Sequence, residues 1–517
     1  MSDRETSAGG PTPPRSNMSW LRRPMTHLLL VVAVLVGAGA LATVLAPSVR
    51  GPEAAATSQV PVSETLVACP GLRSREGFTE STVAAATPPQ VSGVDAGEAG
   101  TGVVRTLTKD PSDDKTLIQL SAPGDRGAYT GRNGERDSVT GSAQGSLAPG
   151  FSVTQTERTV DGPGRGLAGT QCLPTSNDFW FVGAASGVGQ GAVLVLTNPE
   201  DAIATVDVDV FGRRGPVDAP GARGIEVPAR KSVDIRLDQV APGQAVTALN
   251  VQVRVGRLSA AVTETDVFGR EPRGTDWIPG AEPPSTELVV PGVPATTQGR
   301  DSSVRLDVVA PGEAAVASIR LITPEGTFAP QGADVIDVPA GGIKSVDLTD
   351  ALRGDTAAIE VTSDVPVTAG ARVFLNQPGL FGDLMFLAAS PPLGAPAVVP
   401  DNRITKDLAT RLLLTAPVGD ATVDVSAFAG DQQIPIDQVD LAGGTSSTLN
   451  IRPPRGLKRF GLVVTPETGS SVVYGVRMLD EEGPRGPLVT SFPLRTARLL
   501  ATVPVTIPDV RAGTVDR

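Results

Sequence analysis

Apolar and polar residues alternate one by one through much of the chain after residue 47. In Val206-Asp-Val-Asp-Val210 the valines fall on one side and the aspartates on the other, which is typical of a strand with one buried and one wet face. Turn residues such as Asn198-Pro199 and Pro324-Glu-Gly326 separate these runs. Their spacing favours β-sandwiches over strands that alternate with helices. The pattern predicts an all-β body without long helices.

The strand pattern repeats along the chain. The motif Val193-Leu-Val-Leu-Thr-Asn-Pro199 has looser copies at 306–311 and 412–417, and the segment that begins Ile225-Glu-Val-Pro-Ala recurs at 336–340. Repetition at a fixed spacing indicates an array of similar units. The spacing is roughly 110 residues, the size of an immunoglobulin-like domain. The sequence therefore predicts tandem immunoglobulin-like β-sandwich modules.

Segments between the repeats also resemble one another, and they set the predicted boundaries. Leu288-Val-Val-Pro291 and Ala397-Val-Val-Pro400 are expected to form the first strand of a module, and residues 63–70 resemble that strand. Residues around 108–150 are rich in Gly, Ser and Asp and are predicted to form a long mobile loop in a divergent first module. The predicted order is a disordered cytoplasmic tail at 1–27, a transmembrane helix at 28–46, a linker at 47–60, the divergent module at 61–180, and sandwich modules at 181–283, 284–393 and 394–510.

Residues 28–46 are apolar or small without interruption. As a helix they would span about 28 Å, close to the hydrocarbon thickness of a bilayer. Arg15, Arg22 and Arg23 precede this segment, and the next basic residue is Arg50, so the positive-inside rule places the body outside the cytoplasm. A cleavable signal peptide, with Ala40-Leu-Ala42 as its cleavage site, is the alternative. The favoured prediction is a single-pass cell-membrane protein with an extracytoplasmic body.

Charge and histidine content exclude several kinds of function. The net charge of −12 and the pI of about 4.8 argue against nucleic-acid binding, which needs a basic surface. The single histidine, His27, lies at the edge of the apolar N-terminal segment. The body therefore has no histidine for a Ser/His/Asp or Cys/His nucleophile system or for a zinc site. No metal or other cofactor and no catalytic residue is predicted.

Cys69 and Cys172 are the only cysteines, and both follow the apolar segment. In an oxidising compartment we expect them to form a disulfide, with two free thiols as the alternative. Trp180 and Trp277 follow the same segment, in linker-like positions. Packing between modules is the favoured role for both tryptophans, and a platform for a sugar ligand is the alternative.

Several short motifs are better explained by chance. Gly187-Val-Gly-Gln-Gly191 lacks the Lys-Ser/Thr of a phosphate-binding loop and is predicted to be a hairpin turn. Asp110, Asp113 and Asp114 could hold calcium, but their spacing does not match an EF-hand, and a solvated acidic turn is favoured. Arg353-Gly-Asp355 copies an integrin-binding tripeptide and is interpreted as an accidental match in a turn.

The run from Cys172 to Gly183, the Leu-Thr-Asn-Pro and Val-Pro-Ala repeats, and the Asp276-Trp-Ile-Pro linker resemble a family of actinobacterial secreted or membrane-anchored proteins of unknown function. The resemblance covers roughly residues 60–510 and implies location and fold. Its motifs are structural, and it transfers no catalytic residue to this chain.

The expected function is that of a non-catalytic scaffold or interaction partner in the cell envelope. Its partners would be the membrane, through the N-terminal helix, and an envelope protein or polymer, bound by exposed sheet edges and loops. One alternative is a carbohydrate-binding envelope protein. Another is a carboxylate-dependent hydrolase, which requires a cleft with two acidic side chains at catalytic separation.

Overall fold

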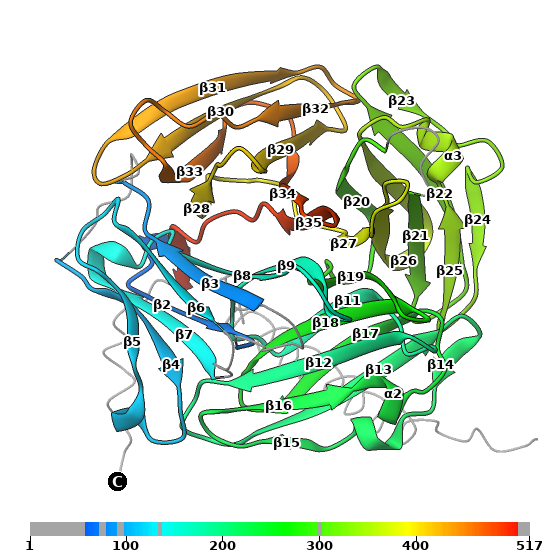
Figure 1. Cartoon of the computed structure of the whole chain (residues 1–517), viewed down its shortest axis with the longest axis horizontal. Coiled ribbons are helices and arrows are strands. Elements are labelled where there is room, and N and C mark those ends of the chain that lie inside the picture. The colour runs from blue at the N-terminus through cyan, green and yellow to red at the C-terminus, as the bar shows by residue number, and fades with distance from the viewer. Residues whose placement is uncertain (1–56, 72–78, 90–97, 133–136, 297–301, 505–517) are drawn as a thin grey trace, which may run out of the picture. The chain divides into compact units, whose positions relative to one another are not determined.

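The computed structural model describes residues 57–71, 79–89, 98–132, 137–296 and 302–504, and strands dominate all of these segments (Figure 1). The all-β prediction is therefore confirmed. The chain divides into two units, Met1–Ser58 with Val503–Arg517, and Gln59–Thr502, and most of the first unit lies outside the described residues. The predicted cytoplasmic tail and transmembrane helix lie outside the described residues. Among the residues that are described, no helix has the length and apolarity needed to cross a bilayer.

Within its described residues the larger unit contains four modules. Module 1 holds β2 (Glu64–Cys69), β3 (Thr79–Ala86), β4 (Gly102–Leu107), η1 (Pro111–Asp113), β5 (Thr116–Leu120), β6 (Arg126–Arg132), β7 (Ser138–Gln144), η2 (Gly145–Leu147), β8 (Ser152–Thr159), β9 (Gly166–Gln171) and β10 (Leu173–Pro174). Module 2 holds β11 (Asp178–Ala184), β12 (Gln190–Asn198), β13 (Ala204–Gly212), β14 (Gly215–Val217), η3 (Pro220–Ala222), β15 (Ile225–Val227), β16 (Lys231–Arg236), α2 (Leu237–Val240), β17 (Thr247–Val255), β18 (Ser259–Phe268) and β19 (Glu271–Ile278).

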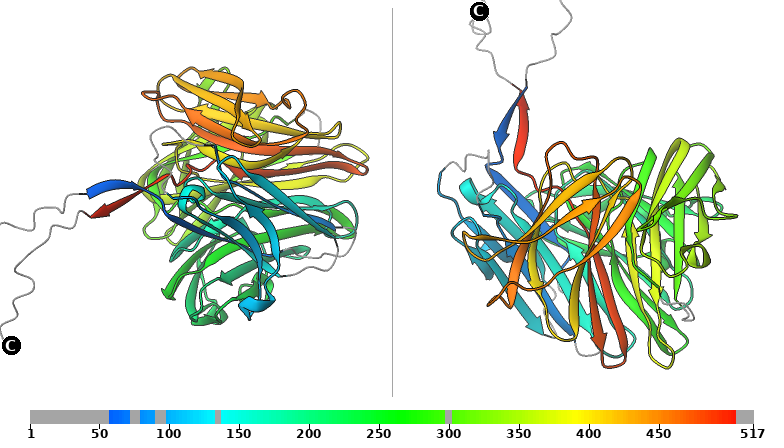
Figure 2. Two further views of the ribbon diagram at one scale, coloured as in Figure 1. Left: turned by 90° about the vertical axis from the view of Figure 1, so that its left-hand side faces the viewer. Right: turned by 90° about the horizontal axis from the view of Figure 1, so that it is seen from above.

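Module 3 holds β20 (Ser285–Val293), β21 (Ser303–Ala310), β22 (Ala315–Thr323), β23 (Gly326–Phe328), β24 (Val335–Val338), β25 (Gly342–Asp347), α3 (Thr349–Leu352), β26 (Ala357–Leu375) and β27 (Asp383–Ala388). Module 4 holds β28 (Ala397–Arg403), β29 (Leu408–Ala416), β30 (Ala421–Phe428), β31 (Gln433–Leu441), β32 (Thr445–Asn450), β33 (Arg459–Pro466), β34 (Tyr474–Gly483) and β35 (Gly486–Pro493). Strands β1 (Thr57–Pro61) and β36 (Leu500–Pro504) pair as a separate two-stranded sheet (Figure 2).

Each module is built from two sets of strands. The orders are β10-β2-β7-β4-β5 and β6-β3-β8-β9 in module 1, β11-β17-β13 and β16-β12-β18-β19 in module 2, and β28-β33-β30-β31 and β32-β29-β34-β35 in module 4. In module 3 the long strand β26 belongs to both sets, because it pairs with β20 and β22 along its first half and with β21 and β27 along its second. A single parallel pairing of Gly212 with Gly342 joins a sheet of module 2 to one of module 3.

The sequence repeats occupy equivalent strands. The first motif forms β12, β21 and β29 in modules 2, 3 and 4, and its alternate residues, such as Leu194 and Leu196, are buried in the core of their own module. Asn198 ends the motif in module 2. Its side chain donates to the carbonyls of Ala202 and Val227 and accepts from the backbone N–H of Glu200, so it fixes the turn after β12.

In module 3 one long strand, β26, takes the place of two strands of module 2. In module 2 the corresponding strands, β17 and β18, are separated by a turn at Gly256, whose φ of +80° favours glycine. Module 3 has Ser363, Asp364, Val365 and Pro366 in the middle of β26 and no glycine there. The chain therefore continues as a strand from one sheet to the other.

Three predicted boundaries need correction. The predicted loop near 108–150 contains β5, β6 and β7, and its glycines serve close packing: a Cβ at Gly127 would lie 2.4 Å from Ile118 Cγ2. The second module begins at Asp178, before residue 181, because all of β11 pairs with β17. The segment predicted as a linker to residue 60 includes β1, which starts at Thr57.

The predicted disulfide between Cys69 and Cys172 is confirmed. Cys69 ends β2, Cys172 follows β9, and both are buried in the core of module 1. The bond closes a loop with a sequence separation of 103 residues. By restricting the unfolded chain, such a crosslink stabilises by a few kcal/mol.

We expect Cys69→Ser with Cys172→Ser to lower the free energy of unfolding of module 1 by about 3 kcal/mol, since both thiols lie in the core and their loop is long. Urea titration of the full-length chain, with limited proteolysis between residues 59 and 174, measures the effect. Serine variants that unfold at the wild-type urea concentration would contradict this expectation.

Candidate functional site

The innermost strands of the four modules meet one another. β9, β19, β27 and β35 contact each other in a closed cycle, and each is the last strand of its own sheet (Figure 1). An edge strand carries backbone N–H and C=O groups without strand partners, and burial makes unsatisfied groups costly. The junction of these strands must therefore supply other hydrogen-bond partners.

Two aspartates supply acceptors at this junction. On β19, Asp276 accepts from Gly169 N at 3.0 Å, from Thr490 Oγ1 at 2.8 Å and from Phe386 N at 3.3 Å, so it contacts the inner strands of the other three modules. Asp383 on β27 accepts from Leu167 N at 3.1 Å and from Val489 N at 2.9 Å. Both aspartates are fully buried. They tie four separate sheets together.

Arg165 supplies donors at the same junction. It is 1% exposed, and its guanidinium donates to the carbonyls of Gly382 at 2.8 Å, Gly486 at 2.7 Å and Pro487 at 3.0 Å. Arg165 precedes β9, Gly382 precedes β27, and the other two acceptors begin β35. One side chain of module 1 therefore holds the starts of two inner strands in modules 3 and 4.

Two glycines allow the inner strands to come this close. A Cβ at Gly169 would lie 2.3 Å from Phe492 Cζ, and one at Gly274 would lie 2.4 Å from Asp383 Oδ1. Gly274 also has a φ of +130°, in the region that L side chains rarely adopt. Any larger residue at either position would push two modules apart.

Burial raises the pKa of the junction carboxyls. The pKa of Asp383 rises to about 8, mainly through desolvation, which its backbone donors and Arg165 oppose. Desolvation also raises the pKa of Asp276 well above its usual range. Burial lowers the pKa of the Arg165 guanidinium. These perturbed groups are enclosed and bonded to the backbone, so their arrangement fits a structural role.

A second buried charge cluster connects modules 2 and 3. Arg372 on β26 donates to Glu264 Oε1 at 2.8 Å and pairs with Asp266, and both acids lie on β18. Glu264 also accepts from the backbone N–H of Ala185 at 2.7 Å, and burial raises its pKa to about 7. The Arg372 guanidinium lies 5.7 Å from the ring centroid of Phe386. Removing any one charged residue from such a buried cluster leaves an uncompensated charge and destabilises the fold.

These shifts predict a pH dependence of stability. Asp383 and Glu264 keep their protons in the folded chain up to about pH 8 and 7, whereas their ordinary values are 3.8 and 4.5. Between these limits the folded state binds more protons than the unfolded state, so the free energy of unfolding falls as pH rises. Urea midpoints at about pH 5.5 and about pH 8 should show this loss, and Asp383→Asn, which cannot ionise, should reduce it. Equal midpoints would contradict the assignment.

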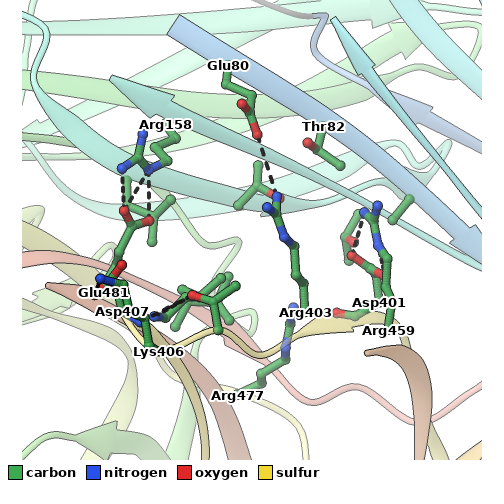
Figure 3. A pocket seen from close by; sticks show the side chains of 17 residues that line it. Glu80, Thr82, Arg158, Asp401, Arg403, Lys406, Asp407, Arg459, Arg477 and Glu481 are labelled. Carbon is green, nitrogen blue, oxygen red and sulfur yellow. Dashed lines mark hydrogen bonds and ion pairs between the residues drawn. The ribbon is translucent and has the colours of Figure 1, made fainter. Parts of the chain in front are cut away.

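A cavity with a strongly charged lining lies between modules 1 and 4 (Figure 3). Its volume is about 480 Å³. Module 1 contributes Glu80, Thr82, Ala84, Thr154, Thr156, Arg158 and Leu167, and module 4 contributes Asp401, Arg403, Thr405, Lys406, Asp407, Leu408, Arg459, Arg477, Leu479 and Glu481. We call this cavity the 1/4 cleft.

Ion pairs cross the 1/4 cleft from one module to the other. Arg158 donates through Nε to both carboxylate oxygens of Glu481, at 2.7 and 2.8 Å, and Figure 3 shows these side chains facing one another. Arg403 reaches Glu80 at 3.8 Å, beyond hydrogen-bond distance. Modules 1 and 4 are therefore joined tightly by Arg158 and Glu481 and only loosely by Arg403 and Glu80.

The other carboxylates of the lining, Asp401 and Asp407, lie in module 4 and pair mainly with basic residues of that module. Asp401 accepts from Arg459 at 2.6 and 2.8 Å, and from Arg126 at 2.5 Å across the interface beside the cleft. Asp407 lies 3.8 Å from Lys406, whose side chain is 90% exposed. Each carboxylate that lines the cleft thus has a basic partner within ion-pair distance.

Arg477 is the buried cation of the 1/4 cleft. It is 4% exposed, and it donates through Nε to Asn402 Oδ1 at 3.1 Å and through Nη2 to the carbonyl of Asp401 at 2.5 Å. Its guanidinium lies 5.0 Å from the ring centroid of Phe492. Burial lowers its pKa to about 10, so it remains a cation at neutral pH. The acceptors that bind it are uncharged.

The two tryptophans singled out by sequence are buried between modules. Trp180 is 7% exposed, stacks on Phe211 at 5.7 Å between centroids, and packs with Val309 and Ile343 of module 3. Trp277 is 1% exposed and packs with Ala168 of module 1. A sugar platform needs an accessible ring face, and neither ring offers one in this structure.

The short motifs take part in turns. Asp110 caps η1 by accepting from Ser112 N, and Asp114 pairs with Arg230 at 2.5 Å. The described residues contain no group of three or more potential metal ligands. Gly189 lies in the turn between β11 and β12 with φ +80°, and Arg353 follows α3 with φ 52°. No motif adds a residue to the 1/4 cleft.

Sequence reasoning missed the junction and the cleft. Asp276 did carry a local signal, because a carboxylate interrupts the apolar end of β19, whose last five residues are all buried. The cleft carried none, since Arg158 and Glu481 are 323 positions apart. Their meeting depends on how the first and last modules pack.

Fold and site together define a class of protein: an all-β chain whose sandwich modules share one junction of inner strands and enclose a charged cleft between the first module and the last. This chain belongs to a family of unknown function (DUF5719), whose model matches residues 127–452. The match covers more than half of the chain, so membership of an uncharacterised family is confirmed. No curated protein matches the sequence.

Proposed function

We propose that the protein is a non-catalytic, membrane-anchored binding protein that holds a rigid β body outside the cytoplasm and contacts a partner in the cell envelope. The observation that carries the proposal is the junction, where Asp276, Asp383 and Arg165 bind backbone groups of neighbouring modules. A body fixed in this way presents its surface groups in constant geometry. Such preorganisation favours recognition.

Two features support the extracytoplasmic location. The apolar segment 28–46, preceded by arginines, has the length and charge flanks of a signal anchor. The buried disulfide between Cys69 and Cys172 would persist in an oxidising compartment and would be reduced in a cytosol. Both point to the same side of a membrane, and the actinobacterial membrane-anchored family that the motifs resemble would have the same topology.

The acidic groups support binding over hydrolysis. A general acid with a raised pKa must reach its substrate. Asp276 and Asp383 have raised pKa values and are fully buried, whereas the carboxylates of the 1/4 cleft have basic partners. Carboxylates held by arginines suit the positioning of a ligand better than proton transfer.

The location is tested with the full-length chain in intact cells. A thiol-reactive polymer that shifts the gel mobility of unfolded, unreduced protein distinguishes free cysteines from the disulfide, and external protease tests access to the body. We expect no shift before reduction, and degradation of the body in unbroken cells. Free thiols together with protease protection until lysis would overturn the proposed location. Crosslinking of native membranes followed by mass spectrometry then identifies the partner.

A further inference from the structure

We propose that the 1/4 cleft binds a sugar unit that carries one anionic group, a carboxylate or a phosphate, with Arg477 and Arg403 binding the anion. This proposal rests on the proposed function, because it names the chemical class of the envelope ligand. It arises from the charge, burial and lining of a cavity that no sequence motif indicated.

Charge is the first argument. The lining has five basic side chains, Arg158, Arg403, Lys406, Arg459 and Arg477, and four acidic ones, Glu80, Asp401, Asp407 and Glu481. This local excess of positive charge occurs in a chain of net charge −12. An acidic protein with a basic cleft repels anions in general and attracts them at one place.

Arg477 gives the second argument. A buried charge is costly unless it is paired. This guanidinium is 4% exposed and lines the cleft. Among the described residues it has no ion pair, and the Asp401 carboxylate, already bound by Arg459 and Arg126, acts on its charge without a direct contact. Its described hydrogen bonds use Nε and Nη2 and end on uncharged oxygens. An anionic ligand in the cleft would supply a counter-charge in direct contact with Arg477.

Two further cations of the lining are exposed and loosely paired. Arg403 is 59% exposed and 3.8 Å from Glu80, and Lys406 is 90% exposed and 3.8 Å from Asp407. Neither distance is a hydrogen bond. These side chains can turn to a ligand without breaking a strong contact, whereas Arg158 and Arg459 are committed to bidentate pairs.

The remaining lining favours a hydroxylated ligand. Thr82, Thr154, Thr156 and Thr405 bring hydroxyl groups, and leucines such as Leu167 and Leu479 bring apolar wall. Threonine hydroxyls both donate and accept, as sugar hydroxyls do. The volume of about 480 Å³ lies in the range of small-molecule sites. None of the lining residues is aromatic, so a nucleobase would find no stacking partner.

Calorimetric titration of the full-length chain in detergent tests the proposal, with glucuronate, glucose 6-phosphate, glucose and inorganic phosphate as probes. We expect both anionic sugars to bind, and glucose and inorganic phosphate to bind at least about tenfold more weakly, because each lacks one part of the recognised chemistry. Affinity should fall as salt is raised. A uronic-acid oligosaccharide that binds more tightly than glucuronate would identify a polymer as the source of the sugar. Equal binding would indicate a single sugar acid.

Variants locate the site. Arg403→Gln should weaken binding of glucuronate about tenfold without changing the melting temperature, because the side chain is exposed and loosely paired. Arg477→Lys keeps the charge in the cleft and should weaken binding through loss of the guanidinium geometry. The matched control is Arg320→Gln, an arginine of module 3 that is 56% exposed and paired with Glu360 at 3.2 Å. It should bind like the wild type.

The proposal fails if neither anionic sugar binds at millimolar concentration, if glucose or phosphate binds as tightly, or if Arg320→Gln weakens binding as much as Arg403→Gln. Failure of the broader function is separate. If external protease reaches the body in cells but no anionic sugar binds, the proposed envelope role stands and the proposed ligand is wrong. If the body stays protected from external protease, the proposed envelope role is wrong, whatever the titrations show.

Discussion

Asp383→Ala is expected to lower the free energy of unfolding by about 4 kcal/mol. The substitution leaves Leu167 N and Val489 N, buried at the junction, without their acceptor. Above the pKa of Asp383, about 8, it also removes the negative charge that opposes the charge of Arg165. The loss should affect the packing of modules 1, 3 and 4 together, because the three residues bound or influenced by Asp383 belong to two other modules.

Urea titration followed by tryptophan fluorescence measures this change, since Trp180 and Trp277 are buried between modules. Asp383→Asn keeps the shape and one acceptor oxygen, so it should lose about half as much. Asp337→Ala, an exposed aspartate of the same module, is the control and should change stability by less than about 0.5 kcal/mol. Similar losses at Asp337 and Asp383 would sink the assigned role of the junction.

Arg372→Met should lower the free energy of unfolding by about 4 kcal/mol, because it leaves Glu264 and Asp266 buried without their cation. Methionine keeps much of the apolar contact with Phe386 and adds no new charge. The same titration measures the loss, which should grow as pH rises through the pKa of Glu264, about 7.

A compensating variant separates charge from shape. Arg372→Met combined with Glu264→Gln and Asp266→Asn removes the cation and both acids, so most of the lost stability should return. If the triple variant is no more stable than Arg372→Met alone, packing by the arginine stem, and not its charge, holds modules 2 and 3 together at this point.

The strands were predictable because their signal is local. In β13 the buried residues Val206, Val208 and Val210 alternate with half-buried positions along the strand, as the sequence alternation indicated. The pairing of Cys69 with Cys172 was predictable because the chain has only two cysteines. The loop predicted near residues 108–150 was wrong mainly because of its glycines, since glycine is common both in loops and where strands pack closely. Gly141 in β7 serves contact, since a Cβ there would meet Val153 Cγ2 at 2.8 Å.

The junction and the 1/4 cleft could not be predicted in the same way. Both arise from contacts between modules, whose relative positions leave no period in the sequence. Arg403 precedes a turn and carries no pattern that distinguishes it from the other surface arginines. Its meeting with Glu80 follows from β28 lying against β3 of module 1. Whether Arg403 lines a charged cleft or lies at a solvated strand end therefore depends on how modules 1 and 4 pack, which the local sequence does not show.

The closed cycle of inner strands imposes an order of events on synthesis. Arg165 can donate its hydrogen bond to the Gly486 carbonyl only after Gly486 has been synthesised, 321 residues later. Until then β9 and β19 present bare edges, which invite pairing with other chains. We therefore expect truncated chains that lack module 4 to aggregate more readily than the full chain.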